Sequence, residues 1–231
     1  MRALAIVSAL QEELAAVLLL MQSQQKQTIA GRDFWFGQLH GHAVIVVLSR
    51  IGKVAAAATA TILMERFAVQ NLVFIGVAGG LHSSVQVGDV VVATEFLQHD
   101  MDASPLFPRF EIPLTGVSCF VADALLSQKL VDAVSRALPR APLHRGLMIS
   151  GDRFVSTRAE SLALQTALPD ALAVEMEGAA IAQVCADYGV AFAAVRTISD
   201  RADDDAHGDF LQFVKTTASP YSAAIVAQLL A

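Results

Sequence analysis

Short runs of apolar residues alternate with longer alanine-rich stretches along this chain, and this alternation limits its fold more than any other feature. Several runs are hydrophobic at almost every position, which is typical of strands that helices bury on both faces. The predicted strands are Ala3–Val7, Gly31–Leu39, Val44–Leu48, Leu72–Val77, Val90–Ala93, Leu147–Ile149, Ala171–Val174 and Phe192–Ile198.

The stretches between these runs have helical length and spacing. The predicted helices are Gln11–Met21, Lys53–Arg66, Ala122–Leu138, Arg158–Leu168, Gly178–Tyr188 and Asp209–Leu230. Pro220 should kink or split the last helix, because proline removes a backbone donor and clashes with the preceding turn. The alternation predicts one α/β domain over residues 1–231, with three α/β/α layers around a mixed, mostly parallel central sheet.

Composition narrows the classes of function. Hydrophobic residues make up 55% of the chain and charged residues 16%, so it can bury a large core. The formal net charge of −6 and the lack of a long basic run argue against nucleic acid as a partner. The longest uncharged apolar stretch, Val54–Met64, is too short to cross a bilayer, so no membrane partner is expected. Two distant cysteines, Cys119 and Cys185, suggest reduced thiols in a cytoplasmic protein.

Acidic or glycine-rich segments follow several predicted strands, at the ends where open α/β sheets bind ligands. They are Gln11-Glu12-Glu13, Val77-Ala78-Gly79-Gly80, Glu175-Met176-Glu177-Gly178 and Ser199-Asp200. We therefore expect three acidic groups to converge on one crevice. Each segment also has a simpler interpretation: acids at a helix start, a tight glycine turn, a solvated strand end and a helix cap, respectively.

The segment Ser150-Gly151-Asp152-Arg153-Phe154-Val155 follows another predicted strand. Phe154 would suit stacking on a flat base, with the backbone of Val155 reading the base edge. The alternative is a polar turn that ends in a buried phenylalanine. Two further segments carry metal-ligand types without a recognised spacing, so no metal site is predicted. They are His99-Asp100-Met101-Asp102 and Asp203-Asp204-Asp205 with His207.

Taken in order, these segments resemble the 5′-methylthioadenosine/S-adenosylhomocysteine nucleosidases of the nucleoside phosphorylase superfamily. The resemblance covers nearly the whole chain. Besides the site segments above, it rests on Ala9-Leu10, Ile51-Gly52-Lys53-Val54-Ala55-Ala56 and Val87-Gly88-Asp89. It implies a nucleoside phosphorylase-like fold and hydrolysis of the N-ribosidic bond of 5′-methylthioadenosine and S-adenosylhomocysteine.

The resemblance also implies roles for individual residues. Glu13 matches the carboxylate that activates water, and Asp200 matches the acid that protonates the leaving purine at N7. The implied substrate-binding residues are Ala78, Gly79, Phe154, Val155, Met176, Glu177, Ser199 and Phe210. No metal or organic cofactor is needed for this reaction. The chemistry is consistent, since an acid at N7 and anionic groups near the ribose both stabilise the charges of the transition state.

Departures from the family pattern leave other functions open. Val77 replaces a common serine, and Arg50 stands where glycine is common. Arg50 could reach an anion, which keeps phosphate-dependent purine nucleoside phosphorolysis as an alternative. A futalosine-type or 5′-deoxyadenosine hydrolase, and a binding domain without activity, are further alternatives.

The segment Met101–Gly116 also differs from the family, being rich in apolar residues and proline. In the family this loop crosses a dimer interface, so the resemblance implies a homodimer with Met101–Gly116 near the interface. Its apolar side chains would suit a methylthio group, whereas Arg109 leaves room for a charged substituent.

Overall fold

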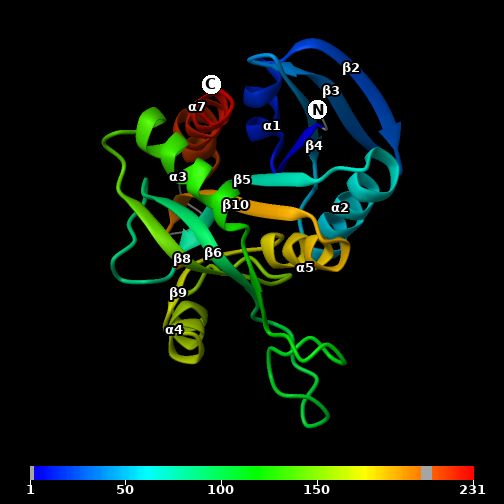
Figure 1. Ribbon diagram of the computed structural model, residues 1–231. Coiled ribbons are helices and arrows are strands. Elements are labelled where there is room, and N and C mark those ends of the chain that lie inside the picture. The colour runs from blue at the N-terminus through cyan, green and yellow to red at the C-terminus, as the bar shows by residue number, and fades with distance from the viewer. Residues whose placement is uncertain (1–2, 204–209) are drawn as a thin grey trace.

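A ten-stranded sheet with helices on both faces forms the framework of the protein in a computed structural model, which describes residues 3–203 and 210–231 (Figure 1). The strands are β1 (Leu4–Ser8), β2 (Gln22–Ile29), β3 (Arg32–Leu39), β4 (His42–Leu48), β5 (Asn71–Gly80), β6 (Val90–Gln98), β7 (Cys119–Val121), β8 (Leu143–Ser150), β9 (Ala171–Glu175) and β10 (Ala191–Asp200). The helices are α1 (Gln11–Leu18), α2 (Lys53–Phe67), α3 (Ala124–Ala137), α4 (Arg158–Ala167), α5 (Gly178–Tyr188), α6 (Phe210–Phe213) and α7 (Ser219–Leu229), with a π-helical segment, η1 (Val214–Ala218).

The strands follow the order β10-β6-β8-β9-β5-β1-β4-β3-β2. Strand β10 also pairs with β5, so the path from β10 through β6, β8 and β9 to β5 closes on itself. The sheet is mixed, as predicted. Parallel pairs join β1 to β4 and β5, β10 to β5, and β8 to β6 and β9. Antiparallel pairs are equally frequent among the described strands. Strands β2, β3 and β4 form a meander, β5 pairs antiparallel with β9, and β6 pairs antiparallel with β7 and β10.

Two hydrophobic cores lie on opposite faces of this sheet. One packs against α2 and α5 and includes the fully buried Phe34, Phe74 and Phe96. The other packs against α1, α3 and α7 and includes Ile6 and Leu130. Alternate residues of β5 therefore enter different cores, and burial of apolar surface on both faces fixes the strand between two helical layers. The predicted three-layer arrangement is confirmed.

The N-terminal region departs from the predicted elements. Helix α1 ends at Leu18 rather than at Met21, and the polar residues after it form the edge strand β2. The residues of β2 are exposed except for Ile29, which is half-buried, so the strand has no apolar alternation that a sequence could reveal. Pairing with β3 makes it a strand.

The C-terminal helical region changes its helical type next to Pro220 rather than being split there. The described part begins at Phe210, and the predicted start at Asp209 lies outside the described residues. The π-helical segment η1 joins α6 to α7 without a break, and Pro220 follows it directly, as the second residue of α7. The missing N–H of Pro220 therefore coincides with a local change in the helical hydrogen-bond pattern. Phe210 is the first residue of α6.

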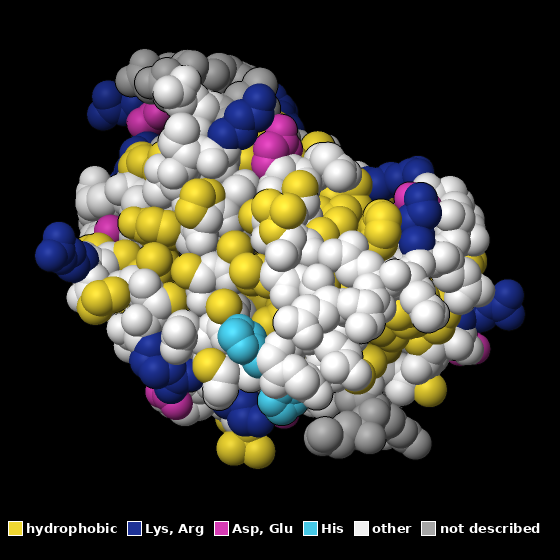
Figure 2. Space-filling model, turned by 90° about the horizontal axis from the view of Figure 1, so that it is seen from above, with side chains coloured by type: hydrophobic (Ala, Val, Ile, Leu, Met, Phe, Trp, Pro, Cys, Tyr) yellow, Lys and Arg dark blue, Asp and Glu magenta, His cyan; other side chains and the backbone are white. Residues whose placement is uncertain are grey.

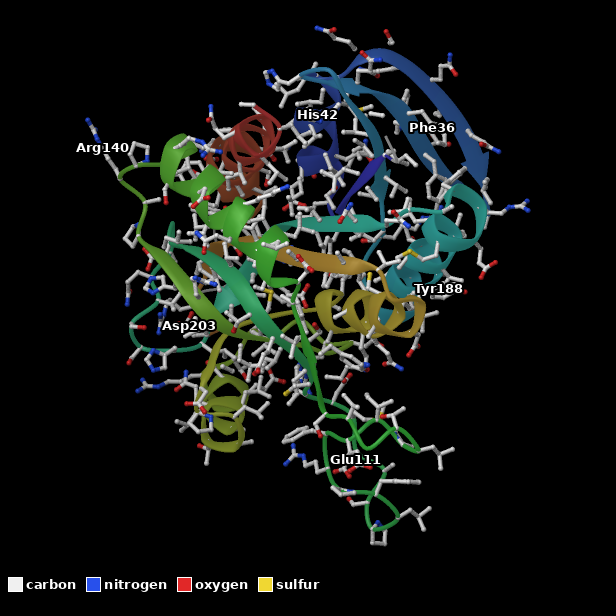
Figure 3. The ribbon with its side chains drawn as sticks, in the orientation of Figure 1. Phe36, His42, Glu111, Arg140, Tyr188 and Asp203 are labelled. Carbon is white, nitrogen blue, oxygen red and sulfur yellow. The ribbon has the colours of Figure 1, made fainter. Side chains whose placement is uncertain are left out.

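The segment Met101–Gly116 projects from the body of the molecule as an irregular lobe that carries Glu111 (Figure 3). Its side chains Leu106 and Leu114 are 83% and 91% exposed. Figure 2 shows another view, in which apolar side chains form patches among polar ones and most charged groups lie toward the rim. None of the described helices is long and apolar enough to cross a membrane. Cys119 and Cys185 are free thiols.

Candidate active site

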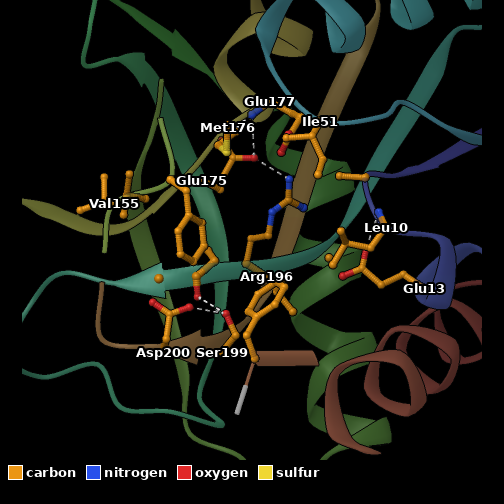
Figure 4. A pocket seen from close by; sticks show the side chains of 18 of the residues that line it. Leu10, Glu13, Ile51, Val155, Glu175, Met176, Glu177, Arg196, Ser199 and Asp200 are labelled. Carbon is orange, nitrogen blue, oxygen red and sulfur yellow. Dashed lines mark hydrogen bonds and ion pairs between the residues drawn. The ribbon is translucent and has the colours of Figure 1, made fainter. Parts of the chain in front are cut away.

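A pocket of about 740 Å³, which includes space open to solvent, lies where β5, β9 and β10 end and where β1 leads into α1. Figure 4 shows its lining from close by. All of the site residues predicted from the sequence line it: Glu13, Ala78, Gly79, Phe154, Val155, Met176, Glu177, Ser199, Asp200 and Phe210. The three carboxylates that were expected to converge are therefore brought to one cavity from segments far apart in the chain.

Glu13 projects from the first turn of α1 and is fully buried. Its Oε2 accepts a hydrogen bond of 3.3 Å from the backbone N–H of Leu10, whereas its Oε1 forms no well-aligned hydrogen bond with the described residues. Burial raises the pKa of Glu13 to about 7, and the charge of Arg196 and the backbone N–H groups of Leu10 and Val77 offset part of this rise. A carboxyl with such a pKa can both take up and release a proton near neutral pH.

Gly76 on β5 makes room for Glu13. Its φ of +151° is one that residues with a side chain rarely adopt. A Cβ atom at this position would lie 3.1 Å from Oε2 and 3.2 Å from Oε1 of Glu13. A side chain at position 76 would therefore strain the backbone and crowd the carboxylate of Glu13.

Glu177 is the residue that precedes α5, and it is buried. Its Oε1 accepts a 2.8 Å hydrogen bond from the backbone N–H of Gly52, at the start of α2. Burial raises the pKa of Glu177, and the neighbouring carboxylate of Glu175 raises it further. Such a group favours a ligand that donates hydrogen bonds to it.

Asp200 is the last residue of β10 and is also buried. Its Oδ2 accepts a 2.7 Å hydrogen bond from the hydroxyl of Ser199, and its Oδ1 accepts one of 2.8 Å from the N–H of Ala202. A bend follows at residues 202–203 instead of a helix, so the helix-cap interpretation of Asp200 is wrong. Gly79 lies against this group, since a Cβ there would be 3.0 Å from Oδ1.

Aromatic side chains form another part of the pocket wall. Phe154 and Phe210 meet edge to face, with ring centroids 6.0 Å apart and an interplanar angle of 73°. Phe154 is 39% exposed, which excludes the interpretation of a phenylalanine buried at the end of a turn. Val155 beside it is buried. A flat apolar ligand would find a large contact surface at this wall.

The family model for the phosphorylase superfamily matches residues 3–231. A 5′-methylthioadenosine/S-adenosylhomocysteine nucleosidase of Shewanella denitrificans is 36% identical over 225 residues, which cover 97% of each chain. The chain belongs to this nucleosidase family.

Solved structures agree with this assignment. The nucleosidase of Neisseria meningitidis in complex with methylthio-immucillin-A has a TM-score of 0.94 and 32% identity, covering 100% of this chain and 99% of that one. The futalosine hydrolase of Helicobacter pylori is similarly close, with a TM-score of 0.91, 31% identity and coverage of 99% and 97%. The present chain is thus a nucleosidase, an enzyme that hydrolyses N-glycosidic bonds, and its fold is that of the nucleoside phosphorylases.

The nucleosidase pocket holds two buried ionic residues that were not predicted as site residues from the sequence. Arg196 lies within β10 and is 1% exposed, and its Nη2 donates a 2.8 Å hydrogen bond to Oε2 of Glu175. Glu175 is also buried. An arginine inside an otherwise apolar strand was the available signal, because such a charge needs a partner. Only the pairing of distant segments identifies that partner.

Arg50 does not line the nucleosidase pocket. Its guanidinium is exposed and donates a hydrogen bond to the backbone carbonyl of Gly31. Within residues 3–203 and 210–231, no group of three or more His, Cys, Asp or Glu side chains could hold a metal ion. Most of the acidic segment 203–207 lies outside the described residues.

Replacement of Gly76 tests whether the nucleosidase needs Glu13 in its observed position. Gly76→Ala should lower kcat/KM for nucleoside hydrolysis by about tenfold or more, because the new methyl group displaces the carboxylate. Gly41→Ala is the matched control, since Gly41 also has a positive φ, of +81°, but open space around its Cβ position. Equal kcat/KM for the two folded variants would show that the position of Glu13 is unimportant.

Proposed function

We propose that the enzyme hydrolyses the N-ribosidic bond of 5′-methylthioadenosine and of S-adenosylhomocysteine and releases adenine. The observation that carries this proposal is the convergence of Glu13, Glu177 and Asp200, all buried, on one pocket with an aromatic wall. The apolar side chains of Leu10 and Ile51 in the lining are compatible with a methylthio group. The Shewanella denitrificans relative carries the same substrate names.

Asp200 is proposed as the general acid. As the bond between the anomeric carbon and the purine breaks, its electron pair moves onto the base, and a proton from Asp200 to N7 neutralises that charge. The Ser199 hydroxyl and the Ala202 N–H hold the two oxygens of Asp200 and so fix its direction. Phe154 and Phe210 would contact the purine ring.

Glu13 is proposed to activate the water that replaces the purine. The water oxygen forms the new bond to the anomeric carbon, and one of its protons passes to the carboxylate. The buried Oε1 forms no well-aligned hydrogen bond with the described residues, which supports this role, because such an oxygen favours a group that donates to it. Glu177 would accept hydrogen bonds from the ribose hydroxyls. These donors, and the positive charge that develops on the sugar, would favour the ionised form of Glu177 against the pKa rise caused by burial.

Hydrolysis is favoured over phosphorolysis by the same charges. A phosphate ion entering the pocket would meet carboxylates, and the guanidinium of Arg50 is directed to Gly31 instead. The similarity to a futalosine hydrolase makes a futalosine-type nucleoside the main alternative substrate. A 5′-deoxyadenosine nucleoside would use the same machinery.

We further infer that residues 1–231 act as one nucleosidase domain and that the protein is a homodimer. The exposed Leu106 and Leu114 support a contact through the projecting lobe Met101–Gly116, because apolar side chains gain from leaving water.

The substrate and the nucleophile are tested together by measuring base release. The purified protein should release adenine from 5′-methylthioadenosine and S-adenosylhomocysteine at the same rate with or without phosphate. Release that depends on phosphate would instead identify a phosphorylase. A preference for futalosine or 5′-deoxyadenosine in the same assay would replace the proposed substrate.

Removal of the proposed acid should affect turnover more than binding. Asp200→Asn should lower kcat by on the order of 10²-fold or more, because the amide cannot donate a proton to N7 in the same way. Asp33→Asn is the control and should leave kcat unchanged, since Asp33 is a half-buried acid on β3 that pairs with Lys26 and does not line the pocket. Near-normal turnover by Asp200→Asn would remove this residue from the acid role.

The proposed base should give the enzyme an acidic limb in its pH profile. Since the pKa of Glu13 is raised to about 7, kcat/KM should fall as the pH decreases through about 7, where the carboxylate becomes protonated. Glu13→Gln should lower kcat and abolish this limb, whereas Glu12→Gln, on the same helical turn, should retain it. A limb that persists in the Glu13→Gln variant belongs to another group.

A further inference from the structure

The buried carboxylate of Glu175 has no part in the proposed reaction, yet it has more hydrogen-bond donors than any of the three proposed carboxylates. Its Oε2 accepts from Arg196, and its Oε1 accepts from the hydroxyl of Ser150. The backbone N–H of Gly178 lies 2.9 Å from both oxygens, and that of Glu177 lies 3.3 Å from both. Both oxygens of Glu175 are therefore held in place by donors at the start of α5.

The guanidinium of Arg196 also has several partners besides Glu175. Its Nη1 donates to the backbone carbonyls of Phe74 and Val195 at 3.1 and 3.2 Å, and its Cζ lies 3.8 Å from the centroid of the Phe74 ring. Its ion pair among the described residues is with Glu175, not with Glu13 or Glu177. Figure 4 shows Arg196 in the middle of the pocket, with Glu175 and Glu177 on one side and Glu13 on the other.

This arrangement matters because Arg196 is the main cation that acts on both proposed carboxylates. Its charge lowers the pKa of Glu13 and that of Glu177, against the larger effect of burial. Without the charge of Glu175, the guanidinium would lose its counter-ion, and its own charge would act more strongly on Glu13 and Glu177 and favour their ionised forms. A carboxylate locked in an ion pair is a poorer proton acceptor.

We propose that Glu175 is a positioning residue, which holds Arg196 away from Glu13 and Glu177 and so leaves Glu13 free to take a proton from water. This inference rests on the proposed hydrolysis. Glu175 is in turn held by the hydroxyl of Ser150 and by the backbone N–H of Gly178. A Cβ at Gly178 would lie 3.2 Å from Oε1 of Glu175, so a larger residue there would crowd the carboxylate.

The test needs a measurement that would not change if Glu175 only stabilised the fold. The pH at which kcat/KM falls on the acidic side is such a measurement. Other charged or titratable groups line the same pocket or lie on the elements packed against α1. The pocket lining adds Arg153, Glu175, Glu177, Arg196 and Asp200, and the elements packed against α1 add the exposed His42 on β4, the exposed Lys215 on η1 and the half-buried Tyr221 on α7. Glu12 is the acidic neighbour on α1 itself.

Glu175→Gln keeps the shape of the side chain and removes its charge. We expect the acidic limb to move to lower pH by about one unit or more, because the unpaired guanidinium now favours the ionised form of Glu13. Direct titration of Glu13 by carbon-13 NMR, assigned with the Glu13→Gln variant, should show the same fall without substrate. Glu95→Gln, an exposed acid on β6, is the control and should change neither value.

The double variant Glu175→Gln/Arg196→Met removes both buried charges, so it avoids the unpaired ion that could prevent the single variant from folding. In this variant the pKa of Glu13 should equal or exceed that of the wild type. An unchanged limb in folded Glu175→Gln, or a lowered pKa in the double variant, would overturn the inference. Failure of the wild type to release adenine would instead refute the proposed function.

Discussion

The parallel pairing of β5 with β10 is the contact on which the positions of the pocket residues depend. The two strands run side by side from Asn71 and Ala191 to Gly79 and Asp200, with a register irregularity after Ile198. Gly76 and Arg196 are partners in this register, as are Gly79 and Asp200. Strand residues that oppose each other are held at fixed spacing by backbone hydrogen bonds. The pairing of β5 with β10 therefore sets the spacing between Arg196 and Gly76, which makes room for Glu13. It also sets the spacing between Asp200 and Gly79.

Charge balance is the second determinant of the pocket. Glu13, Glu175, Glu177 and Asp200 are all buried in it, and Arg196 is the one buried cation in the described lining. Burial of so many acids is costly unless their charge is shared, neutralised by protons or met by donors. The protein uses backbone N–H groups, hydroxyls and the guanidinium for this purpose. Glu13 and Glu177 can still accept further hydrogen bonds, and water or sugar hydroxyls could donate them.

Much of this site was predictable from the sequence because polar residues interrupt a strongly apolar pattern. Glu13, Glu177 and Asp200 each follow a run of strand-forming residues, so the expectation that they share one edge of the sheet needed only the general rule for α/β folds. The central strands were found for the same reason, since burial on both faces gives them a continuous hydrophobic signature.

The features that were missed depend on contacts between distant segments. The pairing of Arg196 with Glu175 and the conformation of Gly76 leave no local pattern, because each depends on a neighbouring strand or helix. Strand β2 was missed because its residues are polar at nearly every position and only its partner β3 holds it extended. The roles of the site residues and the oligomeric state are not fixed by the pattern of apolar residues at all.

The composition of β2 has a consequence for how the protein behaves at high concentration. As the last strand in the sheet order, it presents unpaired N–H and C=O groups to which another chain could add. Its side chains are mainly glutamines with a lysine, and nearly all of them are in water. A chain that added here would gain backbone hydrogen bonds but little dry surface, and it would meet the ammonium of Lys26. The charge of Lys26 is therefore the feature of this edge that opposes pairing with another chain.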